Sequence, residues 1–486
     1  MTDSPTSNAA QSAAPAEPAG GFPELPQGFL FGVASASYQV EGAVDEDGRG
    51  RSVWDTFCDR PGAIANGDTG AVACDHYHRY REDVALLKDL GVDSYRFSIA
   101  WPRVLPAGTG EVNAAGLDFY DRLVDELLAA GIQPAATLFH WDTPQALEDV
   151  GGWASRDTAE HFAAYASVVG ERLGDRVARW MTLNEPNVVT MLGYALGVHA
   201  PGRSMGFEAL PVAHHLLLGH GLAAQALRAA GCSNLGIASN HAPVWPASDS
   251  PEDRQAAEVY DNLWNWMFAD PVLLGRYPVE GTEQGFPTYR DGDLETIRQP
   301  LDWFGINYYN PARIGAPGSA PAGDAATGQA PAAGEVVADG PPMPEGLPFE
   351  SRRIEGYERT DFDWPIVPEG LAQVVRQFRD RYGDALPPVY ITESGCSFSD
   401  GPVDGRVADD RRIAYHDAHL RALAGEIAGG ADVRGYFAWS ATDNFEWAEG
   451  YRQRFGLVHV DYDTQVRTPK DSYHWYRDLI AHTRDR

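Results

Sequence analysis

The feature that most constrains the fold is an alternation of amphipathic helical segments with short apolar segments, repeated along nearly the whole chain. Residues Tyr80–Leu90 show helical spacing of apolar side chains, Gly91 ends that pattern, and the apolar run Ser94–Ile99 follows. Residues Leu117–Ala130 repeat the helical pattern before a further apolar run. Alternation of this kind predicts parallel strands joined by right-handed helical crossovers.

Eight such apolar runs follow one another along the chain. The predicted strands are Phe29–Ser37, Ser94–Ile99, Pro134–His140, Met181–Leu183, Leu235–Ser239, Trp303–Tyr308, Val389–Thr392 and Gly435–Trp439. Eight units favour an α/β fold with a single (β/α)8 TIM barrel and long βα loops over two doubly wound domains. We expect residues 22–486 to form this barrel domain and residues 1–21, rich in Ala, Pro and Ser, to be a disordered tail.

Charge and composition exclude several classes of partner. The formal net charge of −31 should repel nucleic acid and anionic membranes. The N-terminus lacks the basic and apolar segments of a secretory signal, and no run approaches the ~20 apolar residues of a membrane helix. Four scattered cysteines without CxxC spacing favour a reduced, cytoplasmic setting; they are Cys58, Cys74, Cys232 and Cys396.

Two of the apolar runs end in a lone carboxylate. Glu185 lies in Thr182-Leu183-Asn184-Glu185-Pro186, and Glu393 lies in Ile391-Thr392-Glu393-Ser394-Gly395. A carboxylate at the end of a buried strand costs desolvation energy and contributes nothing to packing. Two of them at the C-terminal ends of barrel strands suggest the paired acids of glycoside hydrolysis. The alternative is two unrelated glutamates held in salt bridges.

Other polar and aromatic side chains are expected at the same edge of the barrel, because its C-terminal strand ends converge on one pocket. Sugars require this mixture, since each ring carries hydroxyls around its rim and an apolar face that rests on indole. Any one of these residues alone would more often be structural. The candidates are Gln39, Arg96, His140, Trp141, Asn184, Asn307, Tyr309, Trp439, Glu446 and Trp447.

From about Phe29 to Tyr476 the sequence resembles glycoside hydrolase family 1, the β-glucosidase/β-galactosidase family. The resemblance rests on the two glutamate motifs together with the segments 31–42, 95–103 and 443–447. It implies that Glu185 is the general acid/base and Glu393 the nucleophile of a retaining mechanism, with carboxyl groups about 5 Å apart. Arg96 and Tyr309 are expected to lower the pKa of Glu393, whereas desolvation and Glu393 should raise the pKa of Glu185.

The resemblance also assigns sugar contacts. Asn184 would bind the 2-hydroxyl, Trp439 would lie under the ring, and Asn307 with Tyr309 would complete the surroundings of the nucleophile. Trp141 belongs to the same substrate-binding set. Gln39, His140, Glu446 and Trp447 would hold the 3- and 4-hydroxyls, and a carboxylate at Glu446 should repel a 6-phosphate.

The function that follows is a retaining exo-β-glucosidase with β-galactosidase or β-fucosidase side activity. Its expected substrates are aryl β-glucosides and short cello-oligosaccharides such as cellobiose, as in cellulose degradation. A transglycosylase on the same scaffold is the first alternative, and a non-catalytic sugar-binding barrel, which would need a missing carboxylate, is the second. A homo-oligomer stays open.

Three weaker signals carry no function. The motif Cys74-x-His76-x-His78 lacks an evident fourth ligand, so no metal is expected. The glycine pattern Gly219–Ala224 lies within a helical run instead of at a strand-to-helix turn, so no nucleotide cofactor is expected. The Ala-, Gly- and Pro-rich segment Gly315–Pro348 is predicted to be either a mobile loop over the catalytic face or a solvated insertion without function.

Overall fold

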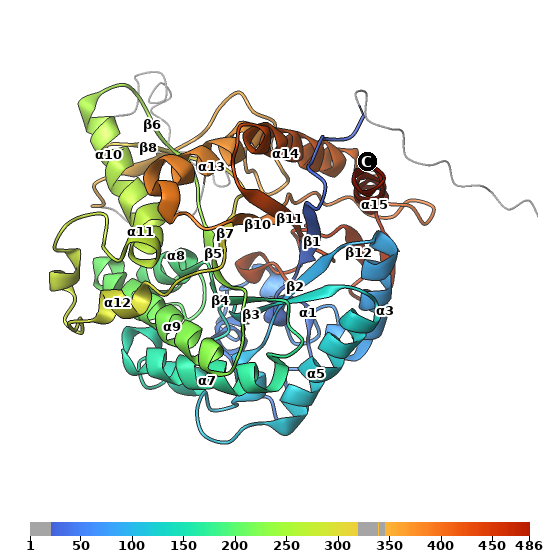
Figure 1. Ribbon diagram of the computed structural model, residues 1–486, viewed down its shortest axis with the longest axis horizontal. Coiled ribbons are helices and arrows are strands. Elements are labelled where there is room, and N and C mark those ends of the chain that lie inside the picture. The colour runs from blue at the N-terminus through green and yellow to red at the C-terminus, as the bar shows by residue number, and fades with distance from the viewer. Residues whose placement is uncertain (1–20, 319–338, 340–345) are drawn as a thin grey trace, which may run out of the picture.

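The computed structural model describes residues 21–318, 339 and 346–486. Eight parallel strands close into a barrel in the order β1-β11-β10-β7-β5-β4-β3-β2, surrounded by helices (Figure 1). The predicted (β/α)8 barrel is therefore confirmed. Almost all of the predicted tail and most of the Ala-, Gly- and Pro-rich segment lie outside the described residues. The barrel strands are β1 (Leu30–Ala34), β2 (Ser94–Ser98), β3 (Gln133–Phe139), β4 (Arg179–Asn184), β5 (Leu235–Asn240), β7 (Phe304–Asn307), β10 (Val389–Ser394) and β11 (Val433–Trp439).

The barrel strands are buried on both faces. Every residue of β1, β2, β7 and β10 is buried, as expected for parallel strands covered by helices. The first predicted strand was too long, because β1 ends at Ala34 and residues Ser37–Val40 form the short helix α1. There the backbone N–H of Val40 bonds to Ala36 O instead of a neighbouring strand. Gln39 thus reaches the site from a helical turn and not from a strand end.

Long helices cover the outside of the barrel (Figure 1). The helix predicted from Tyr80 begins earlier, at His76, and Gly91 ends it in the left-handed conformation, with φ of 78°. The long helices are α3 (His76–Leu90), α5 (Ala114–Ala129), α7 (Asp157–Leu173), α9 (Leu210–Ala229), α10 (Pro251–Asp261), α11 (Met267–Leu274), α13 (Pro368–Tyr382), α14 (Asp410–Ala428) and α15 (Asp471–Arg484). Along the described part of the chain, no helix combines the length and apolar composition that crossing a membrane requires.

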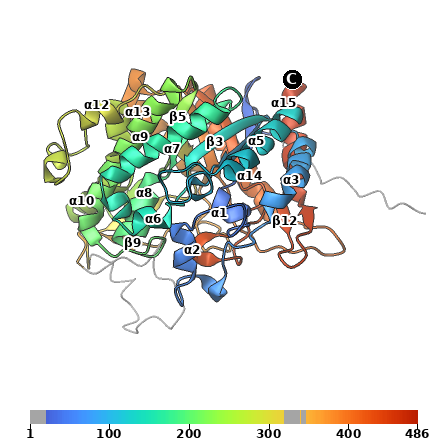
Figure 2. The same ribbon diagram turned by 90° about the horizontal axis from the view of Figure 1, so that it is seen from below.

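Shorter elements are inserted between the barrel units. In Figure 2, α2 and β9 lie toward one end of the molecule, away from α12 and α15. The short helices are α2 (Val53–Cys58), α4 (Trp101–Val104), α6 (Gln145–Glu148), α8 (Pro186–Val188) and α12 (Asp293–Ile297). The π-helical segments are η3 (Val189–Ala195) and η5 (Asn262–Trp266). Two small sheets contain β6 (Val244–Pro246), β8 (Ala312–Gly315) and β9 (Glu350–Arg352), and β12 (Val458–Val460) and β13 (Arg467–Pro469).

Candidate active site

A cavity of about 490 Å³ opens at the C-terminal ends of the barrel strands, a size typical of small-molecule sites. Its lining includes eight of the predicted residues: His140, Trp141, Glu185, Tyr309, Glu393, Trp439, Glu446 and Trp447. The other four, Gln39, Arg96, Asn184 and Asn307, are buried and contact this lining. The structure therefore brings all the predicted residues together.

Glu185 directly follows β4, in a backbone conformation that L-residues rarely adopt. Its φ of 47° places it in the left-handed region at the start of α8, and Pro186 follows. A residue before proline is disfavoured in the right-handed helical region, so the motif keeps Glu185 from simply continuing into the helix. Two further lining residues, Trp141 with φ of 76° and Trp447 with φ of 49°, share this feature. Such strained positions cluster at functional sites.

Glu393 lies inside β10, next to an irregularity in strand pairing. Ile391 pairs with Ile306, but Glu393 pairs with Asn307, which shifts the register by one residue. A bulge of this kind re-aims the side chain beside it. Gly395 then passes so close to β11 that an added Cβ would lie 1.8 Å from Trp439 O. Only glycine fits there, which explains the last residue of the motif.

The carboxyl of Glu393 is held by a cation and a phenol. Arg96 Nη1 donates to Oε1 at 2.5 Å, and the Tyr309 hydroxyl donates to Oε2 at 2.7 Å. Burial nevertheless raises the pKa of Glu393 above its usual range, although these two partners lower it. Arg96 and Tyr309 thus lower the pKa of Glu393 as expected, but the net pKa lies above its usual range because removal of the carboxyl from water outweighs both contacts.

The carboxyl of Glu185 has only neutral hydrogen-bond donors. Asn307 Nδ2 donates to its Oε1 at 2.7 Å and Asn240 Nδ2 at 3.2 Å. Thr392 donates to Asn307 Oδ1, which orients the amide so that its NH₂ group faces Glu185. Burial and the charge of Glu393 raise the pKa of Glu185 to about 8, as expected. Since Glu393 alone of the two contacts a cation directly, the first proton of the pair leaves Glu393.

Two of the predicted residues at the cavity each have a buried polar atom that lacks a partner within the described part of the chain. Asn184 Nδ2 approaches His140 Nε2 at 3.0 Å, which assigns the imidazole proton to Nδ1, and this Nδ1 is unpartnered. Gln39 donates to Asn444 and to Phe445 O, but its Oε1 is unpartnered. Burial lowers the pKa of His140, so the imidazole is neutral. Buried unsatisfied groups are rare, and this pair is placed to bind hydroxyls.

The segment carrying Glu446 and Trp447 is anchored by buried ion pairs. Asp443 accepts from Lys470 Nζ and from Arg454 Nη1, each at 2.8 Å. Burial and nearby carboxylates, led by Glu393, raise the pKa of Glu446 to about 8. The carboxyl is therefore largely neutral near pH 7, so charge repulsion of a 6-phosphate is weaker than the sequence led us to expect.

Several cavity residues were missed from the sequence. Asn240 ends β5, so the same strand-end reasoning that selected Asn184 could have found it. Trp264 lies in η5, and Phe362 and Trp364 lie in the segment before α13, their rings stacked at 4.2 Å. No strand-end signal marks these three aromatic residues.

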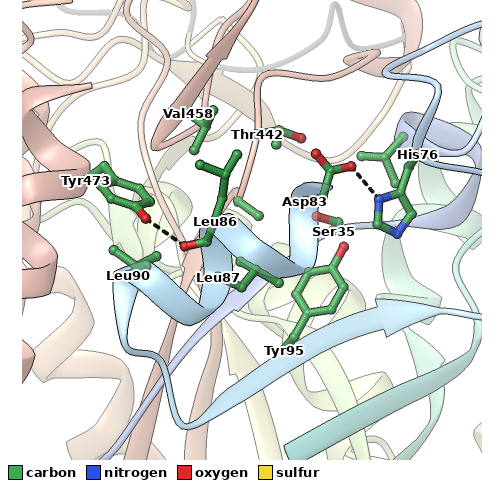
Figure 3. A pocket seen from close by; sticks show the side chains of 12 residues that line it. Ser35, His76, Asp83, Leu86, Leu87, Leu90, Tyr95, Thr442, Val458 and Tyr473 are labelled. Atoms are coloured by element: carbon green, nitrogen blue, oxygen red, sulfur yellow. Dashed lines mark hydrogen bonds and ion pairs between the residues drawn. The ribbon is translucent and has the colours of Figure 1, made fainter. Parts of the chain in front are cut away.

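The motif Cys74-x-His76-x-His78 has separate partners for each side chain. Cys74 Sγ donates to Asp443 O, His76 bonds to Asp83 at 2.7 Å, and His78 bonds to Asp75 at 2.6 Å. Figure 3 shows His76 directed at Asp83 beside a small pocket next to α3. The glycine pattern Gly219–Ala224 lies inside α9.

A parallel eight-stranded barrel with the carboxyls of Glu185 and Glu393 at strand ends and several indoles around one cavity defines a TIM-barrel glycoside hydrolase. The model of glycosyl hydrolase family 1 matches residues 22–485, and the chain belongs to this family.

Close relatives extend over nearly the full length. "Thermostable beta-glucosidase B" of Thermobispora bispora is 48% identical over 476 residues, covering 97% of this chain and 93% of the relative. The structure of the psychrophilic beta-glucosidase BglU of Micrococcus antarcticus has a TM-score of 0.87 and 46% identity, covering 95% and 98% of the two chains. The virulence factor SghA of Agrobacterium tumefaciens, solved with its substrate analog salicin, has a TM-score of 0.86 and 44% identity, covering 94% and 96%.

Proposed function

We propose that this chain is a retaining β-glucosidase that removes terminal, non-reducing β-D-glucosyl residues. The observation that carries the proposal is the pair of buried carboxyls in one cavity, one against a guanidinium and one against neutral amides. Relatives named as beta-glucosidases, at 41–48% identity, support the same activity. The salicin complex of SghA supports aryl β-glucosides as substrates.

In the first step, a carboxylate oxygen of Glu393 attacks the anomeric carbon while the bond to the aglycone oxygen breaks. Glu185, protonated because its pKa is about 8, transfers its proton to that oxygen, so the alcohol leaves neutral. The product is a glycosyl ester on Glu393. Arg96 and Tyr309 hold the carboxylate in place for attack.

In the second step, the charge that raised the pKa of Glu185 is gone, because Glu393 is now an ester. Glu185 has lost its proton and accepts one from water, whose oxygen attacks the anomeric carbon and releases Glu393. Two inversions leave the β-configuration of the sugar unchanged. The proton on Glu185 is thereby restored.

The glycone is proposed to bind through the predicted set. His140 Nδ1 and Gln39 Oε1 offer one donor and one acceptor to sugar hydroxyls, and Trp439 offers an apolar face. Glu446 and Trp447 bind further hydroxyls, with Trp141 packed behind Trp447 at 4.5 Å. Asn184, held by Arg96 and Asn307, is assigned to the 2-hydroxyl. Asn307 and Tyr309 complete the surroundings of the nucleophile Glu393, and Asn307 also donates to Glu185.

Finer features belong to the same proposal: β-galactosidase or β-fucosidase side activity, and short cello-oligosaccharides as substrates within cellulose degradation. The relatives are named as beta-glucosidases, which favours hydrolysis over transglycosylation. The presence of both carboxyls argues against a non-catalytic barrel. A cytoplasmic location of one barrel domain, residues 22–486, is supported by the four buried, free cysteines. Sedimentation analysis would distinguish a monomer from a homo-oligomer.

The test is a panel of p-nitrophenyl β-glycosides and cello-oligosaccharides, with the anomeric proton followed by NMR during early hydrolysis. We expect the β-glucoside to be the best of the panel and β-glucose to appear first. An initial α-product would contradict the two-step mechanism, and preference for another glycone would contradict the assigned substrate.

A further inference from the structure

A second, apolar hollow of about 110 Å³ lies beside the catalytic cavity, and we call it the side chamber. Its walls come mainly from η3, the segment 206–210, η5 and residues 347–349. Among its lining residues are Met191, Leu196, Phe207, Leu210, Leu263 and Phe349. An apolar cavity of about 150 Å³ accepts benzene. The side chamber is therefore large enough for a short run of methylene groups.

The side chamber and the catalytic cavity share a boundary. Leu192, Tyr260 and Trp264 line both hollows, and the rings of Tyr260 and Trp264 are stacked at 6.0 Å with 8° between their planes. Trp264 Nε1 donates to Asn240 Oδ1, and Asn240 Nδ2 donates to Glu185. Since Glu185 is the carboxyl assigned to the leaving oxygen, the boundary lies on the aglycone side.

The chemistry of the walls selects hydrocarbon over sugar. None of the described lining residues is charged, and two of the three polar side chains bond elsewhere: Thr190 donates to Pro186 O at 2.8 Å and Trp264 to Asn240. The third polar side chain is that of Tyr260. A second glucose unit would lose its hydrogen bonds to water there without replacing them. An alkyl chain has no such cost and gains from leaving water.

The backbone on two sides of the side chamber is π-helical. Both η3 and η5 have this wider turn, and both contribute lining residues. π-helical turns are rare and occur frequently at functional sites. Two π-helical segments around one cavity indicate that the side chamber is a functional site.

We propose that the side chamber receives the alkyl tail of the aglycone, so that this chain prefers β-glucosides of straight-chain primary alcohols. The proposal rests on the β-glucosidase function. Each methylene that enters the chamber should improve binding by about three- to fourfold until the chamber is filled. Because the tail lies away from the anomeric carbon, it should stabilise the bound substrate and the transition state equally, lowering KM and leaving kcat unchanged.

The experiment measures kcat and KM for methyl, butyl, hexyl and octyl β-glucosides below their micellar concentrations. Ala195→Phe fills the chamber, and Phe207→Ala removes an apolar wall at a position that is 51% exposed and so should fold normally. Ala229→Phe, at the exposed end of α9, is the matched control for the added ring. We expect KM to fall along the series in wild type and control, and both chamber variants to flatten that fall without changing the values for the methyl glucoside.

A flat series in the wild type would overturn the proposal, as would a fall in KM that neither chamber variant alters. Calorimetry with methyl and octyl β-thioglucosides, which resist hydrolysis, separates binding from catalysis. If affinity rises with alkyl chain length but no β-glucoside is hydrolysed, the proposed function is refuted and alkyl binding by the side chamber stands. If p-nitrophenyl β-glucoside is hydrolysed but KM does not change along the alkyl series, the proposed function stands and the role of the side chamber is refuted.

Discussion

The ends of β4 and β10 carry the same residue type in one cavity, yet the two carboxyls differ in chemistry. Glu393 at β10 contacts the guanidinium of Arg96 and the hydroxyl of Tyr309. Glu185 after β4 receives only the amides of Asn307 and Asn240. Burial raises both pKa values, but for Glu185 the negative charge of Glu393 adds to it.

The comparison shows that the contacting side chains, and not the extent of burial, decide which of the two carboxyls is protonated. Both residues are almost entirely removed from water, since Glu185 is 4% exposed and Glu393 is 3% exposed. A single positive charge placed against one of them decides which is the anion and which is the acid. Changes that remove one side of this asymmetry should therefore have different and ordered consequences.

The largest effect is expected from Glu393→Gly. Loss of the carboxylate removes the covalent step and should lower kcat by about 10⁴-fold or more while the protein still binds ligand. Steady-state kinetics with p-nitrophenyl β-glucoside and calorimetry with a thioglucoside measure both quantities. Added formate, a small carboxylate, should restore part of the rate in the vacated space. Near-normal turnover in this variant would refute the assignment.

Glu185→Ala tests the other side of the comparison. General acid catalysis contributes about 10²–10⁴-fold, so cellobiose should lose a factor in that range. A dinitrophenyl glucoside, whose leaving group needs no proton, should lose far less in the first step. The fall of kcat/KM that we expect above pH 8 in the wild type should also vanish, because the group that titrates there is absent. Equal losses on both substrates would count against an acid role.

Tyr309→Phe removes one of the two contacts to Glu393. A hydrogen bond to a charged group contributes enough to predict a loss of about 10- to 100-fold in kcat/KM. The acid limb of the pH profile should move to higher pH, since the hydroxyl lowers the pKa of Glu393. Tyr308→Phe is the matched control, because the Tyr308 hydroxyl bonds to Val367 O instead. An unmoved acid limb in Tyr309→Phe would break the proposed link.

The smallest effect concerns stability. The pKa of Glu185 is raised by folding to about 8, so its contribution to stability is present below its unfolded pKa, ~4.3, and is lost as pH rises through about 8. Glu185→Gln cannot ionise and should gain in Tm relative to wild type between pH 5 and pH 9, by about 1–3 °C. Calorimetric scans at the two pH values measure it. If the difference in Tm between Glu185→Gln and wild type is the same at both pH values, ionisation of Glu185 does not destabilise the folded protein.

Much of the fold and the site was predictable because its signals are local. Each strand, its helix and its terminal glycine lie within one short stretch, so periodicity alone revealed eight units and placed Glu185 and Glu393 at strand ends. The family motifs carried the remaining candidates. Where a segment changes geometry within a few residues the prediction was wrong, as at Gln39, which lies on α1 and not on a strand.

The sequence by itself determined the barrel, the two carboxyls and most of the polar and aromatic side chains around them. Only the tertiary structure decided the amide donors to Glu185, the raised pKa of Glu393 and the aromatic boundary at Trp264. The contact between Arg96 and Glu393 joins residues 297 positions apart, and burial depends on every element around the cavity. Such quantities arise from the summed packing of distant segments, so no local pattern contains them.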